Sequence, residues 1–230
     1  MIPVLLMLTG VAEAGTFDAP AVCPPGRETQ LEIRALERPR FLMHDKSVGR
    51  DKLILRRTGP DAREIFSLEL NDGRWTCLAI DRGEGRYVVG AFGEVGAWIV
   101  LRSVSYLRES APKLQDSGFT RGNYMALASV ASSDGRYLAF VGGEGNIDGL
   151  YVLDTRHDVV RRLGAPPAPP PVADFQSDER FDWGTGWAGG YLVLEPSVLR
   201  FEGTDVVIAT YGRDTHKARA KKRVVRRFKL

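Results

Sequence analysis

Two histidine–aspartate neighbours come closest to an acid–base pair in this sequence. His44 precedes Asp45 and His157 precedes Asp158, and an imidazole beside a carboxylate is a combination that general acid–base catalysis uses. Neighbouring residues in a strand point to opposite faces, so adjacency alone predicts a polar turn at each place. The sequence also has no Gly-x-Ser-x-Gly turn that would expose a nucleophilic serine. We predict no catalytic residues and favour a protein that is not an enzyme.

The sequence also gives little support for a metal site or a phosphate site. Asp178, Glu179 and Asp182 form an acidic cluster, but they lack the alternating spacing of a calcium loop. Two distant cysteines and three histidines do not make the four-ligand pattern of structural zinc. The glycine-rich stretch at 142–145 is not followed by a helix start that could hold a phosphate. We therefore predict neither a metal nor a cofactor.

A segment rich in aromatic residues is the first candidate for ligand binding. Residues 165–172 (APPAPPPV) predict an extended proline-rich spacer. An irregular loop with several aromatic residues follows and ends at residue 191. Aromatic side chains in an irregular loop can stack on a sugar or a peptide. The alternative is that they bury area by covering a face or plugging a channel. The candidate binding residues are Phe181, Trp183, Trp187 and Tyr191.

The C-terminal stretch 216–230 is the second candidate, because it concentrates positive charge. It holds eight of the 32 lysines and arginines and no acidic residue, so the rest of the chain has fewer basic residues than its 29 acidic ones. Such a run can bind anionic surfaces. The alternative is a solvated edge strand whose charges block edge-to-edge pairing. The candidate contacts are Lys217, Arg219, Lys221, Lys222, Arg223, Arg226 and Arg227, with Lys229 in the same run.

The N-terminal region indicates export. Residues 1–14 (MIPVLLMLTGVAEA) have a short apolar core and a small-x-small ending that suits signal-peptide cleavage before Gly15, although no basic residue precedes the core. A buried N-terminal strand is the alternative. Cys23 and Cys77 are the only cysteines, and an oxidising compartment would let them form one disulfide. Two free buried thiols are the other option. No later stretch approaches the roughly 20 apolar residues of a membrane span.

The segment 132–164 predicts the strands that must position these residues. Ser133-Asp134-Gly135-Arg136 is a tight-turn signal. The apolar run 137–141 (YLAFV) predicts a strand covered on both faces, and 150–154 (LYVLD) predicts its returning partner. The paired arginines of 159–163 (VVRRL) predict a solvent-exposed outer strand.

This pattern resembles the repeat of TolB-like β-propellers, which are related to WD-repeat propellers. The resemblance rests on DGRYLAFV, a glycine-rich turn, LYVLD and RRL, and it covers about 33 residues. It implies a propeller scaffold, and such propellers often serve as periplasmic interaction platforms. It also implies a bacterial source.

Weaker copies of the pattern recur, as a blade that cannot bury both faces alone requires. One copy runs through 85–101, and an earlier one combines 52–56, 64–70 and 75–80 with a hairpin at Asn71-Asp72-Gly73. A last copy runs through 205–211 and 223–230, and 30–36 could pair with it to close the ring. We predict an all-β, β-propeller-like fold of four or five irregular blades, with an open curved antiparallel sheet or a β-sandwich as the alternative.

Together these features predict an exported, non-catalytic binding or protein-interaction module, periplasmic or secreted. It would comprise a signal peptide at 1–14 and a single domain at 15–230. The expected partner is a protein or envelope component and not a nucleic acid. Two alternatives stay open, namely a propeller enzyme acting on a glycan or peptide, and a binder of polyanions or envelope surfaces through the basic C-terminus.

Overall fold

The computed structural model describes residues 21–37, 49–71, 73–95, 98–144, 149–164, 199–213 and 220–230. In these ranges the chain forms fifteen strands and one short helix, and every strand pair is antiparallel. The structure therefore confirms the predicted all-β fold. It contains no helix, within the described ranges, that is long and apolar enough to cross a membrane.

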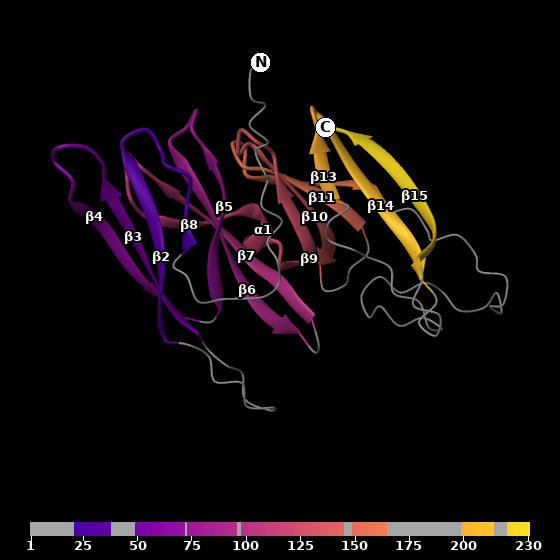
Figure 1. The fold of residues 1–230 in the computed structure, drawn as a ribbon, viewed down its shortest axis with the longest axis horizontal. Coiled ribbons are helices and arrows are strands. Elements are labelled where there is room, and N and C mark those ends of the chain that lie inside the picture. Colours follow the sequence, from indigo (N-terminus) through magenta and orange to yellow (C-terminus); the bar gives the residue numbers. More distant parts are fainter. Residues whose placement is uncertain are drawn as a thin grey trace, which may run out of the picture.

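The first sheet is a meander in which each strand pairs with the next in sequence, in the order β1-β2-β3-β4. It lies at one end of the molecule, drawn in indigo and purple (Figure 1). Its outer strand β4 alternates between exposed and partly buried positions, whereas β3 is buried through its centre. The strands are β1 (Ala21–Val22), β2 (Thr29–Glu37), β3 (Arg50–Arg57) and β4 (Glu64–Leu70).

The central sheet joins two further meanders, β5 to β8 and β9 to β12. The connection between them is one partner pair, Leu101 with Ala126, so each meander keeps its own antiparallel ladder. The helix α1 (Gly118–Arg121) lies in the link between them. The strands are β5 (Arg74–Asp81), β6 (Arg86–Val95), β7 (Trp98–Arg108), β8 (Leu114–Asp116), β9 (Tyr124–Ala131), β10 (Tyr137–Glu144), β11 (Gly149–Asp154) and β12 (Val159–Gly164).

The last sheet is a three-stranded meander at the opposite end of the molecule, drawn in orange and yellow (Figure 1). Its strands are β13 (Leu199–Glu202), β14 (Asp205–Arg213) and β15 (Ala220–Lys229). Counting the two halves of the central sheet separately, the described chain thus contains four consecutive meanders. This is the repetition expected from the sequence.

The described sheets do not close into a ring. Segment 30–36 lies in β2, whose two neighbours are β1 and β3, so the predicted pairing of this segment with the C-terminal strand is wrong. Figure 1 places the first and last sheets at opposite ends of a curved row. The arrangement matches the open antiparallel alternative, built from propeller-like meanders.

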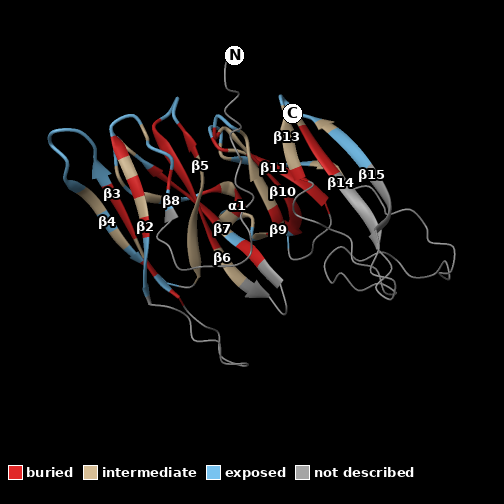
Figure 2. Cartoon of the chain, in the orientation of Figure 1, coloured by how far each residue is buried: buried red, intermediate tan, exposed pale blue. Residues whose placement is uncertain are grey.

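Three apolar clusters lie between successive meanders and hold the row together (Figure 2). Strand β10 shows how they are filled, because successive side chains of a strand point to opposite faces. Leu138 and Phe140 enter the cluster shared with the second meander, while Ala139 and Val141 enter the cluster shared with the fourth. A run of consecutive apolar residues is therefore needed to fill both faces.

The structure also differs from the prediction in which strands make up the first meander. The segment 75–80 was expected to complete it through a hairpin at 71–73, but this segment lies in β5, and β5 pairs with β6. Strand β4 ends at Leu70 in the first sheet, and β5 begins at Arg74 in the central sheet. Cys77 of β5 still reaches the first meander, because its sulfur is bonded to that of Cys23, with Cα atoms 5.4 Å apart. The disulfide thus joins the N-terminal segment to the second meander.

Candidate functional site

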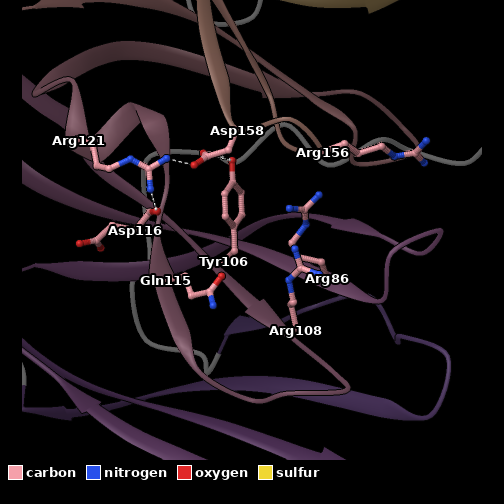
Figure 3. Close-up of a pocket in the computed structure, with 8 residues that line it drawn as sticks. All are labelled: Arg86, Tyr106, Arg108, Gln115, Asp116, Arg121, Arg156 and Asp158. Carbon is pink, nitrogen blue, oxygen red and sulfur yellow. Dashed lines mark hydrogen bonds and ion pairs between the residues drawn. The ribbon is translucent and has the colours of Figure 1, made fainter.

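A polar pocket of about 500 Å³ opens where the second meander meets the third. Its walls come from the start of β6, the end of β7, strand β8, helix α1 and the turn between β11 and β12, as Figure 3 shows. Four arginines and two aspartates contribute to it, a formal excess of two positive charges. We call it the arginine pocket, and its lining residues are Arg86, Tyr106, Arg108, Gln115, Asp116, Arg121, Arg156 and Asp158.

The carboxylate of Asp81 links the second and third meanders to each other. Asp81 ends β5 and its side chain is completely buried. Its oxygens accept hydrogen bonds from the backbone N–H groups of Gly83 (2.9 Å) and Glu84 (3.2 Å) within its own meander. From the next meander, the Arg156 guanidinium donates at 2.8 and 3.3 Å. Burial alone would raise the pKa of Asp81, but these hydrogen bonds outweigh it and hold the pKa below its usual value.

Arg86 carries a buried charge with little compensation. Its side chain is only 4% exposed, and its ion pair to Asp81 is long, at 3.9 Å. The Nε atom has no hydrogen-bond partner. The guanidinium carbon lies 4.8 Å from the centre of the Tyr106 ring, a cation–π distance. Burial, followed by the positive charge of Arg108, lowers the pKa of Arg86, although the Tyr106, Asp81 and Glu84 side chains act in the opposite direction.

Arg108 stands directly opposite Arg86 on the β6–β7 ladder. The two side chains lie next to each other beside the Tyr106 ring (Figure 3). Like charges at opposed positions of an antiparallel pair repel each other. The exposed side chain of Arg108 makes no hydrogen bond and no ion pair with the residues that the structure describes. The pair therefore presents two guanidinium groups to the pocket.

The opposite wall is held in place by Asp158. This residue has a left-handed backbone (φ 57°) in the β11–β12 turn, a conformation that aspartate tolerates better than most residues. Its Oδ1 accepts hydrogen bonds from the Tyr106 hydroxyl at 3.1 Å and from the Gly118 N–H at 2.6 Å, and its Oδ2 pairs with Arg121. Burial raises the pKa of Tyr106 to about 12, so this hydroxyl remains a hydrogen-bond donor at neutral pH.

A second pocket, of about 510 Å³, lies nearby and shares Arg156 with the arginine pocket. Part of its lining is Ser132, Ser133 and Asp134. The Ser132 hydroxyl donates to the carboxylate of Asp134 at 2.6 Å and accepts from the Tyr137 N–H at 2.9 Å. These are the local contacts of a tight turn. They explain the turn predicted from the sequence and leave the serine hydroxyl engaged with its own loop.

The predicted aromatic site, Phe181, Trp183, Trp187 and Tyr191, lies outside the described residues, as do residues 1–14, the pair His44 and Asp45, and the proline-rich spacer. His157 and Asp158 do lie in a turn, as predicted, and the His157 ring pairs with Asp154 at 2.9 Å. Among the described residues, no group of three or more metal-ligating side chains gathers.

The basic C-terminus falls only partly within the described structure. Lys217 and Arg219 lie outside it, and Lys221, Lys222 and Arg223 are placed on β15 by its register with β14. Arg226 is exposed, while Arg227 forms an ion pair with Glu202 of β13. One of the predicted contacts is therefore already matched with an acid of its own meander.

The arginine pocket was not predicted from the sequence, because its lining residues come from five separate segments. One signal did exist. The tripeptide Gly-Arg-Tyr begins both repeats at 85–87 and 135–137, and in each the glycine has a positive φ, 60° at Gly85 and 71° at Gly135. An arginine placed between a turn glycine and a buried strand is held at the sheet edge, and its recurrence could have drawn attention to Arg86.

No protein-family model and no curated protein matches the sequence. The structure is similar to the crystal structure of TolB from Acinetobacter baumannii, with 12% sequence identity and a TM-score of 0.38 over 92% of this chain and 43% of that one. The chain thus spans less than half the length of that protein.

Proposed function

We propose that the protein is a non-catalytic binding module that recognises an anionic group of its partner in the arginine pocket. The observation that carries this proposal is the charge balance there. Arg86 is buried with an unpartnered Nε, and Arg108 faces it across the ladder. A buried charge with so little compensation is costly, and an anion from a partner would supply the missing counter-charge.

The surrounding structure suits binding better than turnover. The pocket lining contains no histidine, cysteine or serine, and its two aspartates have structural partners. Asp158 is bonded to Tyr106, Gly118 and Arg121, while the carboxylate of Asp116 accepts from the Ser105 hydroxyl at 3.3 Å. The rival proposal, an enzyme acting on a glycan or peptide, would need its catalytic groups elsewhere.

Export to the periplasm or the medium forms part of the proposal. The signal-like residues 1–14 support it, and so does the bond between Cys23 and Cys77, because disulfides persist mainly in oxidising compartments. The expected partner is accordingly a protein or another component of the cell envelope. Thiol alkylation after cell fractionation checks this part. Export predicts that the chain is found outside the cytoplasm with both cysteines protected from the reagent.

A thermal-unfolding experiment tests the binding function. The midpoint is measured with sulfate, citrate, acetate and chloride at constant ionic strength, because a ligand that binds only the folded state raises the midpoint. We expect at least one anion to stabilise the protein beyond chloride, and the stabilisation to fall in Arg108→Gln. The control is Arg102→Gln, which changes an exposed arginine of the same strand outside the pocket. Equal shifts in all three proteins would contradict the proposal.

The basic C-terminus supports a second binding surface less strongly, because Arg227 is engaged with Glu202. A test cannot remove the whole segment, since β15 pairs along β14 and Phe228 packs against the last apolar cluster. Substituting the exposed Arg226 together with Lys229 by glutamine leaves these contacts in place. Unchanged retention of this variant on heparin would argue against a polyanion site on this strand.

A further inference from the structure

The second meander places two arginines opposite each other, Arg86 and Arg108, where the third meander places Arg136 opposite Thr155. In the third meander, Arg136 occupies the position of Arg86. The strand partner of the following tyrosine there is Asp154, whose carboxylate lies 3.7 Å from the Arg136 guanidinium. The same register of the second meander places a leucine opposite Tyr87. Both arginines thus have an acid nearby, Asp154 at 3.7 Å from Arg136 and Asp81 at 3.9 Å from Arg86, and both have an unpartnered Nε. The second meander differs because Arg108 adds a further positive charge opposite its arginine.

The acid that does approach Arg86 is already occupied. Asp81 accepts four hydrogen bonds at 2.8 to 3.3 Å, two from the Arg156 guanidinium and two from backbone N–H groups. Its contact with Arg86 is longer than any of these, at 3.9 Å. One carboxylate thus faces two arginines and binds mainly one of them. Arg108 then adds a further positive charge opposite Arg86.

From this arrangement we infer that the arginine pocket binds a phosphate group in its doubly charged form, with Arg86 and Arg108 as the paired donors. The inference rests on the proposed binding function and names its ligand class. A phosphate monoester carries about 1.5 to 2 negative charges at pH 7 and three strong acceptor oxygens. Its two charges match the two guanidinium groups of Arg86 and Arg108, because Arg156 is already paired with Asp81 and Arg121 with Asp158. A monocarboxylate would compensate only one of the two.

The shape of the site agrees with a phosphate carried on a larger molecule. Arginine binds phosphate through planar, paired N–H donors, and the Arg86 Nε is a buried donor without a partner. The amide of Gln115 lines the same side of the pocket as the two arginines (Figure 3). A volume of about 500 Å³ exceeds what a phosphate alone occupies. The group that bears the phosphate therefore has room beside it.

Titration calorimetry at fixed ionic strength tests the inference with inorganic phosphate and acetate as probes. We expect phosphate to bind the wild type about tenfold or more tightly than acetate. Arg108→Gln should weaken phosphate binding by about tenfold or more, because hydrogen bonds to charged groups are worth a factor of that order. Arg86→Lys keeps the charge and loses the planar fork, so it should weaken phosphate binding while leaving the protein folded. Arg102→Gln should bind as the wild type does.

The outcomes separate this inference from the proposed function. If acetate or citrate binds in a manner that depends on Arg108 while phosphate does not, the phosphate assignment is overturned and the binding function stands. If the binding of no anion depends on Arg108, both the phosphate assignment and the proposed binding function are wrong. Two arms then identify the source of the phosphate. Binding of glycerol 3-phosphate indicates a soluble ester, whereas retention on phosphatidylcholine vesicles only when they contain phosphatidic acid, and only with Arg108 present, indicates a lipid. Either source supports the inference, and failure of inorganic phosphate and of both arms overturns it.

Discussion

Replacing Asp81 with asparagine is expected to destabilise the junction between the second and third meanders. The substitution keeps the size of the side chain and removes the charge that Arg156 and Arg86 share. The principal partner, Arg156, is 35% exposed, and the buried Arg86 lies farther away, at 3.9 Å, so the interaction is only partly buried. Losing hydrogen bonds to a charged group costs about 1.5 to 3 kcal/mol. At about 2 to 4 °C for each kcal/mol, the unfolding midpoint should fall by roughly 3 to 12 °C.

Urea unfolding at pH 7, followed by fluorescence, measures the change in the free energy of unfolding. Asp61→Asn is the matched control, because Asp61 is an exposed carboxylate in the turn between β3 and β4. It should change stability by less than about 0.5 kcal/mol. The Arg156→Gln substitution should destabilise the wild type and have little further effect in Asp81→Asn. If Asp81→Asn unfolds like the Asp61 control, the carboxylate does not hold the meanders together and the reasoning fails.

The stabilisation that Asp81 provides should decrease as the pH falls. The folded-state pKa of Asp81 lies below its ordinary value, so the folded protein binds this proton more weakly than the unfolded chain does. Its stabilisation is therefore complete above the unfolded pKa, about 3.9, and is lost as the pH falls through the folded value. The stability difference between wild type and Asp81→Asn should narrow on acidification, and a difference that stays constant down to pH 2 would refute this assignment.

Four further variants test other contacts of the fold by urea unfolding. Tyr87→Phe removes a hydroxyl that donates to the carbonyl of Thr29, at the start of β2, and accepts from the N–H of Gly26, just before β2. It should cost about 1 to 3 kcal/mol. Gly203→Ala and Gly135→Ala both place a side chain at positive φ, which costs about 1 to 2 kcal/mol of strain. Of these two positions, only Gly135 would bring the new Cβ within 2.2 Å of a backbone oxygen, so Gly135→Ala should lose more stability. Equal losses of stability in the two variants would contradict this difference. Replacing Cys23 and Cys77 together by serine should cost about 2 to 5 kcal/mol, whereas no loss would show that the bond does not constrain the chain.

The third meander could be predicted from the sequence because its signals are local. The runs 137–141, 150–154 and 159–163 lie within β10, β11 and β12. The double layer of apolar side chains on β10 also follows from alternation along one strand. Arg161 and Arg162 are exposed on β12, the outermost strand of its sheet. Each of these features depends on residues close together in the chain.

Partner choice for β5 failed because it is not a local property. The sequence Asn71-Asp72-Gly73 has the composition of a hairpin turn, and the same composition also suits a connection between two sheets. What decides the matter is the longer ladder that β5 forms with β6, which runs from Arg74 opposite Phe92 to Asp81 opposite Arg86. That ladder can be recognised only when both strands are aligned in register. Turn signals alone therefore show where a strand ends and not which strand it joins.

The arginine pocket could not be predicted either, because it depends on both strand pairing and the stacking of two meanders. Arg86 and Arg108 become neighbours only through the β6–β7 register, and Arg156 joins them only when the third meander stacks on the second and its turn reaches Asp81. Each arginine taken alone resembles an ordinary charged residue at a strand end. The comparison of repeats shows why they form a site, since each meander places an acid near its arginine and only the second adds another arginine opposite it. A search for function in chains built of repeats should therefore compare the charges at equivalent strand ends, because an external ligand can compensate a charge that one repeat carries in excess of its neighbour.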